Sequence, residues 1–169
     1  SARPPLTQAP RSCGDKLDLG GRVRLGAAKS VRTAQVTPEN PMPKLEIRAP
    51  NAPEDIAAIG TLCWEYRDFL LSLGGKDAEI VRLFYPENAY RALVSELEEK
   101  HKAPGGMRLV FLDGAPVGCG MWHALTPEDA EIKRVFLRPE ARGTGAGRRL
   151  METLIAACRD AGFERILLD

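Results

Sequence analysis

Residues 135–147 read Val-Phe-Leu-Arg-Pro-Glu-Ala-Arg-Gly-Thr-Gly-Ala-Gly and join an apolar strand to a glycine-rich loop, after which an amphipathic helix begins at Arg148. The first turn of a helix leaves backbone N–H groups without partners and carries the positive end of the helix dipole. Glycines at 143, 145 and 147 keep side chains away from these amides. The junction is therefore a predicted binding site for a phosphate or a pyrophosphate.

The spacing of the glycines distinguishes three kinds of phosphate-binding loop. A P-loop requires a lysine and a hydroxyl residue after its last glycine, whereas Gly147 is followed by two arginines, which excludes it. A dinucleotide-binding Rossmann unit requires a third glycine where Arg148 stands, but Asp169 lies at about the distance of its ribose-binding carboxylate, so this reading stays open as a minor alternative. The third pattern, Arg/Gln-x-x-Gly-x-Gly/Ala, is matched by Arg142, Gly145 and Gly147.

With its strand, loop and helix, the stretch from Glu131 to Gly162 resembles the acetyl-coenzyme A loop of the GNAT-type N-acetyltransferases, and the order of elements agrees over residues 45–169. The resemblance implies an α/β acyl-CoA N-acyltransferase fold, in which a mixed, mostly antiparallel sheet is flanked by helices. It also implies that the chain, which stops after the apolar run 166–168, lacks the last helix and two strands of that fold.

Two regions are expected along the chain. Residues 1–43 mix proline, glycine and arginine without any period, which predicts a disordered N-terminal extension, with a transit-like peptide as the alternative. Residues 44–169 are expected to form an N-acetyltransferase domain that is incomplete at its C-terminus.

The composition narrows the compartment and the partners. The chain has 24 basic and 23 acidic residues among 169, and its net charge of +1 gives no broad attraction to nucleic acid or anionic lipid. No apolar run reaches membrane-spanning length, and the start lacks the apolar core of a secretory signal. The four cysteines stand far apart, so we expect no metal site and a reduced, cytoplasmic setting.

Apolar periodicity and turn residues predict the remaining elements. They are a strand over 45–48, a helix from Pro53 to Gly74, a helix over 87–102, strands over 107–112, 116–123 and 130–137, a helix over 148–161 and a strand over 163–168.

Two local features refine this prediction. The dipeptide Asp113-Gly114 indicates a tight β-hairpin. In the run 130–137, Ile132 and Phe136 are expected on one face of the sheet and Val135 and Leu137 on the other, and a bulge near Arg134 would reconcile them.

Acetyl-coenzyme A is the cosubstrate that the resemblance implies. The loop amides would take its pyrophosphate, the strand 135–137 would bind its pantetheine arm, and the N–H of Val135 would face the thioester carbonyl. The expected cofactor-binding residues are Val135, Phe136, Leu137, Arg142, Gly143, Thr144, Gly145, Ala146, Gly147 and Arg148.

The acceptor amine must lose a proton before it attacks, which requires a carboxylate or an ordered water. Glu131 is the candidate base, and its alternative role is a simple partner of Lys133. An acyl-enzyme at Cys119 is a further alternative, although this position favours core packing. His123 is expected to be structural or exposed.

The expected function is transfer of acetyl from acetyl-coenzyme A directly to a primary amine of a small molecule or peptide, by an enzyme that could associate as a homodimer. A non-catalytic module that binds coenzyme A is the alternative. Trp64, Phe84 and Tyr85 are candidates to line the acceptor pocket, whereas Tyr66 and Tyr90 fall on helix stripes that predict core packing.

Overall fold

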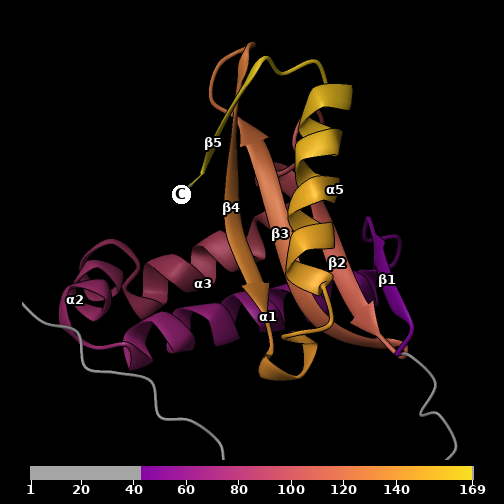
Figure 1. The fold of residues 1–169 in the computed structure, drawn as a ribbon. Helices are drawn as coiled ribbons and strands as arrows, with labels where there is room; N and C mark the ends of the chain where they lie inside the picture. Colours follow the sequence, from indigo (N-terminus) through magenta and orange to yellow (C-terminus); the bar gives the residue numbers. More distant parts are fainter. Residues whose placement is uncertain (1–42, 169) are drawn as a thin grey trace, which may run out of the picture. The chain divides into compact units, whose positions relative to one another are not determined.

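The computed structural model describes residues 43–168, which form one five-stranded sheet with helices on both faces (Figure 1). Residues 1–42 of the predicted extension lie outside the described part of the chain. The elements are, in chain order, β1 (Leu45–Arg48), α1 (Pro53–Ser72), α2 (Gly75–Phe84), α3 (Glu87–Ser95), α4 (Leu97–Lys100), β2 (Gly106–Leu112), β3 (Ala115–Ala124), β4 (Asp129–Leu137), the 3-10 turn η1 (Pro139–Ala141), α5 (Ala146–Asp160) and β5 (Arg165–Leu168).

The sheet has the strand order β1-β2-β3-β4-β5 and is antiparallel except for its last pair. Strands β4 and β5 run parallel and are joined across α5. This mixed, mostly antiparallel sheet agrees with the predicted fold class and is not the parallel sheet of a Rossmann unit. The predicted hairpin turn is confirmed by the left-handed backbone of Asp113 (φ 51°) and Gly114 (φ 83°).

Each face of the sheet carries its own apolar core. On one face, α5 packs Leu150, Leu154 and Cys158 against the strands, at the four-residue steps of one helix stripe. On the other face, α1 packs Ile59 and Cys63 against β2, β3 and β4, together with residues of α3 and α4. Figure 1 shows α5 and α1 on these two sides. Within residues 43–168, the helices fall short of the length and apolar character needed to traverse a lipid bilayer.

The predicted helix over 87–102 is divided in two by the structure. Helix α3 ends at Ser95, and Glu96 (φ −110°, ψ 16°) leaves helical geometry before α4 begins. Because no proline or glycine stands there, the sequence carries no signal for the break. Helix α2 was not predicted either, since its ten residues keep only Ala78 and Val81 buried and so present a weak apolar stripe.

The bulge predicted near Arg134 is present, and it changes which side chains share a face. Two residues of β4, Arg134 and Val135, stand opposite the single β3 residue Gly120, and Arg134 has a φ of 50°. The extra residue reverses the alternation of the strand. As a result Ile132 joins Val135 in the core beneath α5, while Phe136 belongs to the core beneath α1. The expected pairing of Ile132 with Phe136 on one face was wrong.

Candidate functional site

The glycine-rich loop leaves the end of β4 and enters α5 through left-handed backbone. Gly143 has a φ of 76° and Gly145 a φ of 82°, and Gly145 is the N-cap of α5. A Cβ atom at either position would meet nothing within 4 Å. Glycine is therefore required here for backbone conformation rather than for space inside the protein.

Most backbone amides of this loop have no acceptor within residues 43–168. The exceptions are Arg142, whose N–H donates to the carbonyl of Pro139 at 3.0 Å, and Ala146, whose N–H approaches the hydroxyl of Thr144 at 3.3 Å. Free donors at a helix N-terminus, with no acidic residue in the first turn, favour an anion. The amides without a chain acceptor are those of Gly143, Thr144, Gly145, Gly147 and Arg148.

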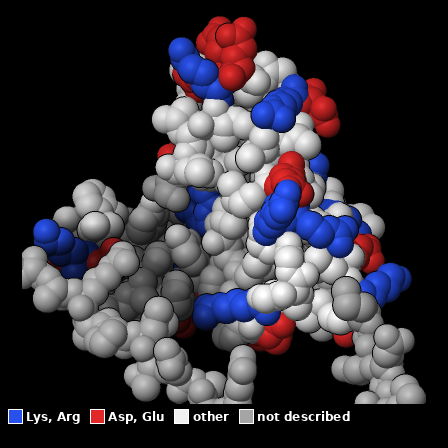
Figure 2. All heavy atoms as spheres, in the orientation of Figure 1, with Lys and Arg blue, Asp and Glu red and all other residues white. Residues whose placement is uncertain are grey.

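Fixed positive charge surrounds the same end of α5. Arg142 is exposed, and its guanidinium lies 5.8 Å from the ring centre of Phe69 on α1. Arg148 is also exposed and pairs with Glu152 one turn later, with Nε and Oε1 2.8 Å apart. Figure 2 shows basic side chains gathered over the first turns of α5. The loop is thus an electropositive surface with backbone donors at its centre.

The last part of β4 leads directly to this loop. The pairing of β4 with β5 runs from Asp129 to Ile132, and β4 then continues to Leu137 beyond the described end of β5. Val135 and Leu137 are half-buried beside α5, and Phe136 lies on the opposite face. The structure thus places the three predicted strand residues in one extended segment that ends at the loop.

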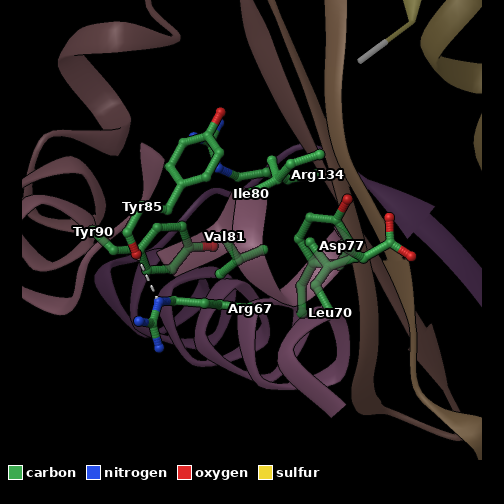
Figure 3. Close-up of a pocket in the computed structure, with 9 residues that line it drawn as sticks. Arg67, Leu70, Asp77, Ile80, Val81, Tyr85, Tyr90 and Arg134 are labelled. Atoms are coloured by element: carbon green, nitrogen blue, oxygen red, sulfur yellow. Dashed lines mark hydrogen bonds between the residues drawn. The ribbon is translucent and has the colours of Figure 1, made fainter. Parts of the chain in front are cut away.

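A cavity of about 340 Å³ lies on the α1 side of β4 (Figure 3). Its wall includes Tyr66 and Arg67 of α1, and Arg134 of β4. Tyr85, which follows α2, and Tyr90 of α3 also line it. Tyr85, a candidate for the acceptor pocket, lines this cavity, and so do Tyr66 and Tyr90, for which packing was expected. Tyr90 does both, because its hydroxyl also donates to the carbonyl of Cys63 at 2.8 Å.

The other two aromatic candidates lie outside the wall of this cavity. Trp64 packs edge-on against Tyr90, with ring centres 5.0 Å apart. Phe84 is 66% exposed.

The two arginines of the cavity were not singled out from the sequence. Arg134 follows another basic residue, Lys133, so its charge did not mark it as a binding residue, and the bulge expected near it was the one signal that this position is unusual. Arg67 looks in sequence like an ordinary polar residue of a helix. Both enter the site only because α1 packs across β4.

Glu131 stands on β4 before the bulge, opposite His123 of β3. Its Oε2 is 2.9 Å from Nζ of Lys133 and 3.5 Å from Nε2 of His123. The alternation of the strand turns Glu131 away from Ile132 and α5, and so toward the face that carries α1 and the cavity. Both of the roles expected for Glu131 are compatible with this position.

Cys119 of β3 is fully buried in the core beneath α1. Its hydrogen bond with the Cys63 thiol, together with burial, raises the pKa of the Cys119 thiol well above its ordinary value. A thiol held neutral in this way is a poor nucleophile, which favours the packing role.

Comparison with known proteins places this site in context. The model of the Acetyltransferase (GNAT) family matches residues 56–169. An IAA acetyltransferase of Azospirillum brasilense is 43% identical over 58 residues, which are 33% of this chain and 37% of that protein. The chain therefore spans well under half the length of this curated relative.

Two solved structures have the same fold. An acetyltransferase from Streptococcus agalactiae superposes with a TM-score of 0.55 at 23% identity, over 73% of this chain and 71% of that chain. The PaiA N-acetyltransferase of Thermoplasma acidophilum, solved in complex with coenzyme A, superposes with a TM-score of 0.50 at 16% identity. The match covers 71% of this chain and 75% of that chain.

Proposed function

Since the chain belongs to the acetyltransferase (GNAT) family, we propose that it transfers an acetyl group from acetyl-coenzyme A directly to a primary amine. The observation that carries this proposal is the row of loop amides without chain acceptors at the start of α5, directly after β4. A pyrophosphate would satisfy several of these donors at once and would lie at the positive end of the helix dipole.

The cosubstrate would lie along β4 and the loop. The pyrophosphate would bind the amides between Gly143 and Arg148, with Arg142 and Arg148 adding positive charge. The two amide groups of the pantetheine arm would pair with the backbone of Val135, Phe136 and Leu137 as an added strand. The coenzyme A complex of the PaiA enzyme, which shares the fold, supports this choice of ligand.

The chemistry would take place beside the bulge. A bulge leaves a backbone group of the longer strand unpaired, so the N–H of Val135 is the candidate donor to the thioester carbonyl. Attack by the amine nitrogen on this carbonyl carbon forms a tetrahedral oxyanion, which the N–H would stabilise by about 3 kcal/mol.

Glu131 would accept the proton that the amine loses, directly or through one water. Collapse of the intermediate breaks the carbon–sulfur bond, and the thiolate takes up a proton as it leaves. The products are an acetylated amine and coenzyme A.

Acetyl-coenzyme A binding tests the proposal through one matched pair of variants. Gly145→Asp and Gly145→Asn impose the same left-handed strain and nearly the same volume, but only aspartate adds a negative charge. Calorimetry should show that the wild-type protein binds acetyl-coenzyme A and that Gly145→Asn has a lower affinity. The affinity of Gly145→Asp should be lower than that of Gly145→Asn by at least about tenfold. Equal affinities for the two variants, or no binding by wild type, would contradict the proposed site.

A coenzyme A-binding module without turnover is the second candidate. It is favoured by the ion pair between Glu131 and Lys133, whose Oε2 and Nζ atoms are 2.9 Å apart, because a carboxylate held in an ion pair is less able to act as a base. Release of free thiol from acetyl-coenzyme A in the presence of any of a broad set of amines would exclude it.

A further inference from the structure

Arg134 is a buried cation without an acidic partner in the described chain. The residue is 8% exposed, and within residues 43–168 no carboxylate forms an ion pair with it. Its partners are neutral groups: Nη1 is 3.9 Å from the sulfur of Met121, a weak acceptor, and the guanidinium also forms a hydrogen bond with the Tyr90 hydroxyl. Burial of an unpaired guanidinium is costly, so such groups are normally paired with an anion.

Arg67 of α1 provides a second guanidinium in the cavity wall. Its Nε donates to the carbonyl of Tyr85 at 3.0 Å, which fixes the side chain. Its nearest carboxylate, that of Asp68, is 3.9 Å away and is 73% exposed, so it screens this charge weakly. In Figure 3, Arg67 and Arg134 approach the cavity from α1 and β4. The exposed carboxylate of Asp77, also at the rim, lies apart from both.

The rest of the wall is apolar or aromatic. Leu70, Ile80 and Val81 line the cavity together with the three tyrosines. A volume of about 340 Å³ is at the small end of ligand sites, which suits a molecule of amino-acid size. Two guanidinium groups in one cavity would repel a polyamine, whose second ammonium would have to enter the same space.

We infer that the acceptor amine carries a carboxylate, which binds the guanidinium groups of Arg134 and Arg67, and an apolar or aromatic body, which packs against the tyrosine-lined wall. This inference rests on the proposed function, because it names the substrate class of that same site. Arg134 immediately precedes Val135, the proposed oxyanion donor, so a carboxylate held there would bring a nearby amino group to the thioester. Arg134 and Arg67 would thus determine specificity.

Matched pairs of amines test the inference with the full chain. Each pair consists of an amino acid and the amine that lacks its carboxylate: phenylalanine with phenethylamine, tryptophan with tryptamine, and leucine with 3-methylbutylamine. Thiol release from acetyl-coenzyme A should give a kcat/KM about 100-fold higher for at least one carboxylate-bearing member than for its partner. If the amines without carboxylate react equally well or better, the inference is wrong while the acetyltransferase function stands.

Variants then assign the preference to the cavity. Arg134→Gln should reduce that 100-fold ratio to less than about tenfold while leaving acetyl-coenzyme A affinity unchanged. Arg134→Lys keeps a positive charge but cannot bind a carboxylate at two points, so its ratio should lie between those of wild type and Arg134→Gln. Arg82→Gln removes an exposed arginine of α2 that is not part of the cavity wall, and it should keep the wild-type ratio. A ratio unchanged in both Arg134 variants would overturn the assignment.

A binding measurement separates this inference from the proposed function. If no amine releases thiol, the proposed function fails, and calorimetry with N-acetylphenylalanine and its neutral amide still tests the carboxylate site. Tighter binding of the carboxylate form by wild type, lost in Arg134→Gln, would support the site. Equal binding of both forms, or of neither, would overturn it.

Discussion

Arg138 forms a two-point ion pair with Glu65 that joins the end of β4 to α1. Nε of Arg138 is 2.7 Å from one carboxylate oxygen of Glu65, and Nη2 is 2.6 Å from the other. Arg138 also donates from Nη1 to the carbonyl of Pro116 at 2.9 Å, and from its backbone N–H to that of Val117 at 2.8 Å. One residue therefore holds α1, β3 and the start of the loop in register.

Glu65→Gln should weaken both the fold and the proposed coenzyme A site. The pair is only partly buried, so we expect the free energy of unfolding to fall by about 0.5–1 kcal/mol in urea denaturation. Because the loop is then held less firmly, the affinity for acetyl-coenzyme A measured by calorimetry should fall about threefold, the equivalent of about 0.7 kcal/mol. Glu87→Gln is the control, because it breaks an exposed pair with Arg91 far from the loop and should change neither value. Equal effects of the two variants would contradict the role given to Arg138.

Gly118→Ala and Gly120→Ala should destabilise the sheet by crowding. A Cβ at position 118 would lie 2.7 Å from the carbonyl oxygen of Phe136, and one at position 120 would lie 2.6 Å from Cδ1 of the buried Leu154. Each substitution should cost about 1–3 kcal/mol of unfolding free energy in urea titrations.

Gly60→Ala provides the comparison for these two variants. Its Cβ would meet only a side-chain atom of Val94, at 3.3 Å, and alanine is about 1 kcal/mol more favourable than glycine in a helix. A neutral or stabilising effect is therefore expected. Loss of stability comparable to that of Gly118→Ala would show that crowding of the sheet is not the cause.

His101 should make the fold sensitive to mild acid. Burial lowers the pKa of His101 to about 4, despite the hydrogen bond that Nδ1–H donates to the carbonyl of Trp122 at 2.9 Å. An unfolded histidine has a pKa of about 6.5, so between these values the unfolded chain binds a proton that the native protein does not. Stability should be complete above about pH 6.5 and fall toward pH 4. In His101→Asn, the free energy of unfolding from urea denaturation should change less steeply with pH over this range. An unchanged dependence on pH would exclude His101 as the cause.

Asp55 should act in a lower pH window. The hydrogen bonds from Arg48, followed by that from the Asn51 N–H at 2.9 Å, lower the pKa of Asp55 to about 2. Its stabilising effect is complete above the unfolded pKa of about 3.9 and is lost as the pH falls toward 2. Asp55→Asn should be less stable than wild type at pH 7, and the difference should shrink below pH 4. A difference that stays constant between pH 7 and pH 2 would rule out this ion pair as its source.

Several elements were accessible from sequence because their signals are local. The Asp113-Gly114 hairpin, the apolar stripe of α1 and the strand–loop–helix junction each depend on residues that are close along the chain. The bulge at Arg134 was also predicted, from the imperfect alternation of one strand. Its consequence for Ile132 and Phe136 was not, because a count of alternation cannot show on which side the extra residue is accommodated.

The sequence by itself determined the mostly antiparallel sheet, the family, and the glycine-rich loop at the start of α5. Backbone conformation and short-range periodicity are encoded by neighbouring residues, so these features can be read along one segment. Only the tertiary structure decided that Arg67 and Arg134, 67 residues apart in numbering, line one cavity, and that Glu65 anchors Arg138. Those relationships depend on how α1 packs across β4, a long-range result of burying two apolar faces that no local pattern specifies.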